Sequence, residues 1–216
     1  GPKLKWIKSD LKDKIFLISL LVVSILISFF IVKIFDTNIL VNTILISSAL
    51  YLFLITLRDF FNKKYKNFAQ NTAHFGFSLL ILSILFNNLF SSEIITNLKV
   101  GETYDNSKTK IVFESINQKK EKNYKSIIAN FNITSSEGIN SNLSPELRIY
   151  NQPNITTSEA DIKTTLMKDK FIVINLVQNQ DYFNVRYQVK PFMLWIWLSV
   201  IMISLGGLAS LLKKRI

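Results

Sequence analysis

The sequence contains no cysteine and only one histidine in its 216 residues. Without cysteine the chain forms no disulfide, uses no thiolate chemistry and holds no cysteine-ligated metal, and it suits either side of a membrane. A single histidine cannot build the usual structural zinc site, and the sequence contains no recognisable Ser-His-Asp set or glycine-rich phosphate loop. These absences argue against a self-contained enzyme.

Hydrophobic residues make up 49% of the chain, which is too large a share for an ordinary small soluble domain. Four apolar runs match the ~20 residues that cross a bilayer. They cover about 15–34, 39–57, 70–90 and 191–212. Pro191 opens the last run, and proline is well tolerated in the first turn of a helix. The sequence therefore predicts a membrane protein with four transmembrane helices.

A long insert divides these predicted helices into three before it and one after it. We expect residues 1–91 to hold an N-terminal segment and the first three helices, 92–190 to form a separate domain, and 191–216 to hold the fourth helix and a basic tail. The chain lacks an initiator methionine, and its first apolar run is too long for a cleavable signal peptide. We therefore expect a fragment or a processed piece.

The net charge of +11 is unevenly distributed. The short segments 1–14, 58–66 and 213–216 together carry +9, whereas residues 92–190 carry only +2. Lys and Arg in short loops and tails favour the cytoplasmic side of a membrane. We therefore expect both termini and the 58–66 loop to be cytoplasmic and the insert to face outward. Because orientation accounts for the charge, we expect no binding to nucleic acid.

The insert has the pattern of β-strands. Residues 110–114, 125–133 and 183–189 alternate, or nearly alternate, between apolar and polar positions, as half-buried strands do. Residues 171–177 form a continuous apolar run suited to a central strand. An insert of this size can bury one small core. It therefore predicts a compact antiparallel sheet or a small barrel.

His74, the only histidine, lies inside the third apolar run. Ionisable residues within membrane spans are costly to desolvate, and they usually bind or relay something. One imidazole nitrogen can ligate haem iron while the other donates to a hydroxyl, such as that of Thr72 or Ser78. The alternative is an interfacial histidine that only forms a hydrogen bond with a neighbouring helix.

Several short motifs, taken in their order along the chain, resemble the C-terminal third of the CcmF (cytochrome c maturation protein F) family. In the membrane segments these motifs are Gly1-Pro2 with Trp6, Ala73-His74-Phe75-Gly76, Lys190-Pro191-Phe192, Trp195-Ile196-Trp197 and Gly206-Gly207. In the insert they are Asn123-Tyr124, 144–150, 159–162 and Val185-Arg186-Tyr187. The chain departs from the family pattern at 169–171 and at Ser199, where no chemistry is expected.

The resemblance implies part of a haem lyase that attaches haem covalently to the CxxCH motifs of apocytochrome c, and this part is not expected to be active alone. By resemblance, His74 is an axial ligand of haem b, and the second ligand lies upstream of this sequence. The implied partners are apocytochrome c, a haem chaperone, thiol-handling maturation proteins, the upstream half of the same lyase and membrane lipid. The implied location is the bacterial inner membrane with residues 92–190 in the periplasm, or else the mitochondrial inner membrane.

Two other functional interpretations remain open. One is a non-catalytic membrane-anchored β module that recruits a partner, with His74 structural. The other is the similarly arranged membrane protein of the second cytochrome c maturation system, whose insert is usually much longer.

Several individual residues also have a purely structural role as the alternative to a functional one. Trp195 and Trp197 fit an aromatic belt better than haem contact, and Gly206-Gly207 fits helix packing. Glu146 and Arg148 form a candidate ion pair. Glu159 could serve either a partner or the fold.

Overall fold

The computed structural model describes residues 11–35, 38–61, 68–136, 138–177 and 180–213. The Gly1-Pro2 and Trp6 motif and most of the 58–66 loop lie outside these residues. The described chain divides into a helical unit, which ends at Leu89 and resumes at Phe192, and a β domain at Phe90–Pro191.

Four helices make up the described part of the helical unit: α1 (Leu11–Ile34), α2 (Ile39–Phe61), α3 (Phe68–Phe90) and α4 (Met193–Lys213). All four are long and apolar enough to cross a membrane. Several hydroxyls within them bond to carbonyls one turn earlier, as Ser24 Oγ does to Leu20 O at 2.8 Å. This local bonding satisfies polar side chains where lipid offers no partner.

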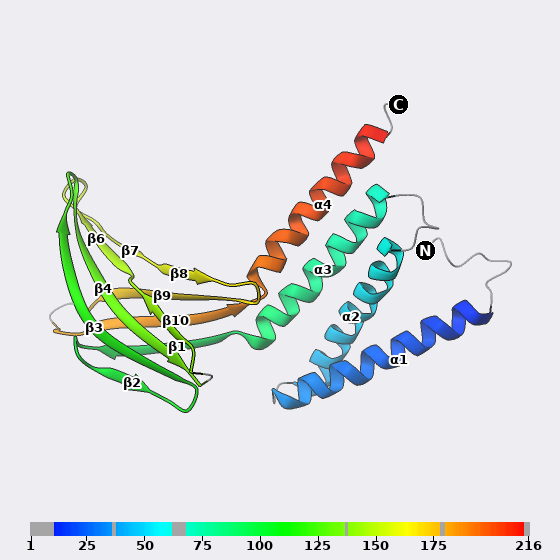
Figure 1. The fold of residues 1–216 in the computed structure, drawn as a ribbon, viewed down its shortest axis with the longest axis horizontal. Helices are drawn as coiled ribbons and strands as arrows, with labels where there is room; N and C mark the ends of the chain where they lie inside the picture. The colour runs from blue at the N-terminus through cyan, green and yellow to red at the C-terminus, as the bar shows by residue number, and fades with distance from the viewer. Residues whose placement is uncertain (1–10, 36–37, 62–67, 137, 178–179, 214–216) are drawn as a thin grey trace. The chain divides into compact units, whose positions relative to one another are not determined.

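The β domain holds ten strands within the described residues: β1 (Ser92–Leu98), β2 (Thr103–Asp105), β3 (Thr109–Lys120), β4 (Tyr124–Ser135), β5 (Asn140–Leu143), β6 (Glu146–Tyr150), β7 (Thr156–Glu159), β8 (Asp161–Thr164), β9 (Lys168–Leu176) and β10 (Phe183–Pro191). They form two antiparallel sheets (Figure 1), ordered β1-β10-β9-β8 and β2-β3-β4-β6-β7, with β5 also paired to β4. The chain passes between the sheets at Ala160, which alone separates β7 from β8. The domain is therefore a β-sandwich.

The core of the sandwich comes from alternate residues of the long strands. Phe113 of β3 and Phe131 of β4 stack with their ring centroids 4.4 Å apart, and Phe113 is fully buried. Ile172 of β9 and Val185 of β10 are also fully buried, from the other sheet. Burying these side chains is the main favourable term that holds the two sheets together.

The predicted fold class is confirmed: four apolar helices carry an inserted antiparallel β domain, and the expected small sheet or barrel is a sandwich of two sheets. One local prediction is wrong. Pro191 does not begin a helix, because it is the last residue of β10 and pairs with Lys168. Proline is tolerated there because a strand end needs no further N–H donor. Phe192 follows with a φ of 59°, and α4 begins at Met193.

Candidate functional site

His74 lies in the second turn of α3, on a face that neither neighbouring helix covers. Exposed residues recur along this face with helical spacing, namely Gln70, His74, Phe77, Ile84 and Asn88. We call these five residues the His74 face. Among the described residues, the His74 imidazole has no hydrogen-bond or ion-pair partner. Both nitrogens are therefore open to a ligand or to a further element.

The side of α3 towards α2 is closed by aromatic and hydroxyl contacts. The Phe75 ring packs on Phe53 and Phe60, with centroids 5.5 Å and 5.2 Å away. Ser78 Oγ lies 2.6 Å from Thr56 Oγ1 in a buried hydrogen bond between the helices. α3 is therefore firmly positioned against α2.

α3 and α4 lie side by side (Figure 1), and small residues close the side of α3 towards α4. Gly206 approaches so closely that a Cβ built on it would lie 2.7 Å from Ala73 N and 2.8 Å from Ala69 O. Gly76 meets α4 in the same way, with Ser199 O 3.0 Å from such a Cβ. Gly76 therefore faces α4 and leaves no room beside His74, as helical geometry predicts for residues two apart.

The structure does not bring the expected hydroxyls to the imidazole. Thr72 Oγ1 donates to Phe68 O at 2.8 Å, and Ser78 Oγ is engaged by Thr56 and by Phe75 O. His74 therefore has no orienting hydroxyl within the described helices.

The other residues singled out from the sequence either have structural partners or lie exposed on a helix. Trp197 is 62% exposed and Trp195 is half-buried, on different sides of α4. Gly206 packs against α3, whereas a Cβ on Gly207 would meet nothing within 4 Å. Only the first glycine of the pair serves helix packing.

The acidic residues of the insert join its strands together. Arg148 Nη2 lies 3.1 Å from Glu146 Oε2, and Arg148 Nη1 lies 3.8 Å from Glu159 Oε1. The Arg148 bond lowers the pKa of the Glu146 carboxyl below its ordinary value. Asp161 Oδ2 accepts a hydrogen bond from Ser144 N at 2.6 Å. These contacts support a role in maintaining the fold.

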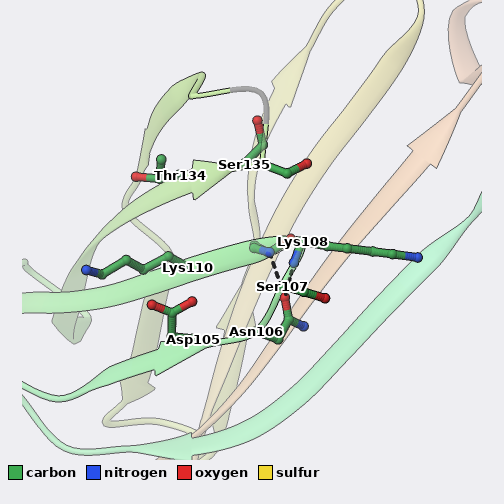
Figure 2. Close-up of a pocket in the computed structure, with 9 residues that line it drawn as sticks. Asp105, Asn106, Ser107, Lys108, Lys110, Thr134 and Ser135 are labelled. Carbon is green, nitrogen blue, oxygen red and sulfur yellow. Dashed lines mark hydrogen bonds between the residues drawn. The ribbon is translucent and has the colours of Figure 1, made fainter.

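A shallow polar depression lies between the β2–β3 turn and the end of β4 (Figure 2), with a volume of about 170 Å³. Asn106 Oδ1 shapes the turn by accepting hydrogen bonds from Lys108 N and Thr109 N. Lys110, Thr134 and Ser135 also line the depression. It contains neither a histidine nor a nucleophile paired with a base, so His74 stays the stronger candidate. No metal-binding group of His, Asp or Glu occurs in the described parts of the chain.

The sequence pointed to His74 but missed the interhelical bond between Thr56 and Ser78. The available signal for this bond was that each of two apolar runs contains a hydroxyl residue. Such residues form hydrogen bonds between neighbouring membrane helices. Which hydroxyls face each other could not be deduced, since that depends on how the helices rotate.

Comparison with known proteins gives consistent matches. Residues 89–191 match the family model described as the CcmF C-terminal beta-sandwich. The Escherichia coli cytochrome c-type biogenesis protein CcmF is 27% identical over 143 residues, which are 66% of this chain and 22% of that protein. The Rhodobacter capsulatus protein ccl1 is 28% identical over the same shares. The Pseudomonas fluorescens CcmF is 24% identical over 180 residues, 77% of this chain and 27% of that protein.

A solved structure of a cytochrome c haem lyase CcmF has the same fold, with a TM-score of 0.67 and 15% identity over 93% of this chain and 34% of that one. The chain thus spans only about a fifth to a third of the length of these proteins. Together with the four apolar helices, the matches indicate a multi-pass membrane protein. The chain is therefore similar to the C-terminal part of the CcmF proteins, and its residues 89–191 match the model of the CcmF C-terminal beta-sandwich.

Proposed function

We propose that the chain takes part in cytochrome c biogenesis, as part of a haem lyase that attaches haem covalently to the CxxCH motifs of apocytochrome c. The similarity to proteins named for cytochrome c biogenesis and the fold shared with a haem lyase support this proposal. Thioether formation adds each cysteine S–H across a haem vinyl group, so the sulfur and its proton both end on the former vinyl carbons. Both thiols are those of the CxxCH motif of the apocytochrome.

We further propose that His74 is an axial ligand of a haem b within the membrane. The observation that carries this proposal is the exposed imidazole, which has no partner among the described residues and lies on a face with apolar Phe77 and Ile84. A haem needs such an apolar wall and a neutral imidazole nitrogen. By resemblance to the CcmF family, the second ligand is a histidine upstream of this sequence. Bound there, haem b would supply a one-electron redox centre, and His74 would hold its iron.

The proposed setting is the bacterial inner membrane, with both termini in the cytoplasm and residues 92–190 in the periplasm. The charge bias of the short segments supports this orientation. A mitochondrial inner membrane is the alternative. The proposed partners are apocytochrome c, a haem chaperone, thiol-handling maturation proteins and the upstream half of the same lyase.

The test is a pyridine haemochrome spectrum of the chain co-purified with its upstream half. We expect wild type to contain haem b and His74→Ala to lose most of it. Asn88→Ala is the matched control, since Asn88 is exposed on the same face at the other end of the helix. It should keep its haem. Added imidazole should restore haem to His74→Ala if only the ligand is missing.

Two outcomes would count against the proposal. Equal haem in wild type and His74→Ala would remove His74 from haem ligation. Absence of haem from all variants, with the two halves still associated, would favour the membrane-anchored β module that recruits a partner.

A further inference from the structure

The β8–β9 hairpin presents two large apolar side chains at its tip. Leu166 is 61% exposed and Met167 is 55% exposed. Turns normally carry Gly, Asn, Asp, Pro or Ser, so two adjacent large apolar residues at a turn are unusual. A single exposed leucine is common on protein surfaces and needs no explanation. Two large apolar side chains exposed side by side at the tip of a hairpin do need one.

The turn beneath these side chains is held by three hydrogen bonds. Thr165 N donates to Lys168 O at 3.0 Å, and Thr165 Oγ1 donates to the same oxygen at 2.6 Å. Lys168 N donates back to Thr165 Oγ1 at 3.1 Å. The two residues between are thereby fixed at the outer end of the hairpin and cannot fold back into the sandwich.

Strand register places this tip at the end of the β domain where the chain enters the helices. Lys168 pairs with Pro191, and α4 begins at Met193. On the neighbouring strand Ser92 pairs with Val189, and α3 ends at Phe90. Paired residues of antiparallel strands lie about 5 Å apart. The tip therefore lies only a few residues from the start of α4 and from the end of α3, counted across the paired strands.

The chemistry around the tip suits a lipid surface. Lys163 and Lys190 flank the hairpin in the register of β8, β9 and β10. Lysines in such places lay their stems along apolar surface and reach lipid phosphates with their charge. The first two turns of α4 carry Trp195 and Trp197, residues typical of the membrane interface.

We propose that Leu166 and Met167 insert into the interfacial layer of the bilayer. The hairpin tip is then a third attachment of the β domain to the membrane, besides its connections to α3 and α4. The three attachments follow one another along one end of the sheet, in the strand order β1-β10-β9. This inference does not depend on haem binding by His74.

The absence of cysteine makes the test direct, because a single introduced cysteine is the only labelling site. Met167→Cys in the full chain is labelled with an environment-sensitive fluorophore and reconstituted into phosphatidylcholine and phosphatidylglycerol vesicles. Ile155→Cys is the matched control, because Ile155 is 50% exposed. Ile155 immediately precedes β7, and β7 and β8 separate it from the hairpin tip. Quenching is then measured with lipids that carry a spin label near the headgroup, and with aqueous iodide.

We expect severalfold stronger lipid quenching at position 167 than at position 155, and the reverse order for iodide. Leu166→Asp in the Met167→Cys background should abolish the difference. Equal quenching at both positions would overturn the proposal. Protection of position 167 from both quenchers would also overturn it, and would mean that a protein segment covers the tip.

Discussion

At the scale of single residues, Arg148 organises the outer surface of the sheet formed by β4, β6 and β7. Its guanidinium lies 3.1 Å from Glu146 and 3.8 Å from Glu159, and 5.3 Å from the centre of the Tyr124 ring. Exposed ion pairs contribute little individually. Arg148 nevertheless contacts two carboxylates and one aromatic ring, and these groups belong to three neighbouring strands, β4, β6 and β7. Its guanidinium therefore links the three strands on their outer surface.

This arrangement predicts a pH dependence at Glu146. Its pKa lies below the ordinary value of 4.5, first because it accepts a hydrogen bond from Arg148. A lowered pKa in the folded state stabilises the fold above pH 4.5, and the stabilisation is lost as the pH falls through the folded value. We expect hydrogen exchange in β6 to be faster in Glu146→Gln than in wild type at neutral pH, with the difference vanishing under acid conditions.

The control for this prediction is Glu114→Gln, which changes an exposed carboxylate of β3. It should leave β6 exchange unchanged at every pH. A difference between Glu146→Gln and wild type that persists unchanged into strong acid would contradict the assignment.

At the scale of elements, the contact of α3 with α4 depends on Gly206. A methyl group there would meet backbone atoms closer than 3.0 Å, whereas one on Gly207 would meet nothing within 4 Å. We expect Gly206→Ala to destabilise the helix pair by about 1–3 kcal/mol through overpacking. Gly207→Ala should be neutral or slightly stabilising, because alanine favours the helix. Thermal unfolding in detergent, followed by tryptophan fluorescence of α4, compares the two variants. Similar losses of stability in both would contradict close packing at Gly206 alone.

The sequence predicted the long elements better than the short ones. The apolar runs of α1 to α4 and the alternating or continuous patterns of β3, β4, β9 and β10 are strong signals, because each buries its own face. By contrast, β7 reads Thr-Thr-Ser-Glu and has no apolar residue. It is a strand because β6 pairs with it, and pairing between distant segments leaves no local pattern.

For the candidate site, the sequence supplied the residue but not its surroundings. An ionisable side chain in an apolar run was enough to select His74. That α2 covers Ser78 and α4 covers Gly76 depends on the rotation of packed helices, which similarly apolar faces do not specify. The boundary at Pro191 failed for a related reason, since proline suits the end of a strand as well as the start of a helix.

At the scale of the whole molecule, the β domain buries a core made only of its own residues. We therefore expect residues 90–191, expressed without the helices, to fold and to unfold cooperatively when heated.

In this isolated domain, Phe113→Ala should lower the free energy of unfolding by about 3–5 kcal/mol, because Phe113 is fully buried against Phe131. Val112→Ala, on the other face of the same strand, should cost much less. Circular dichroism during thermal unfolding measures all three proteins. A gradual transition in the wild-type domain would show that the helices are needed for its fold.

The pairing of β1 with β10 sets the order in which the molecule can be completed. β1 follows α3 directly and β10 ends just before α4, yet the two strands pair along their length, from Ser92 with Val189 to Leu98 with Phe183. Contacts between such distant segments form late, because a long loop must close first. Protease resistance of chains arrested at successive lengths should therefore rise sharply only after Pro191 has been synthesised. Until then β1 lacks its partner strand, so the sandwich is completed only shortly before α4 is synthesised.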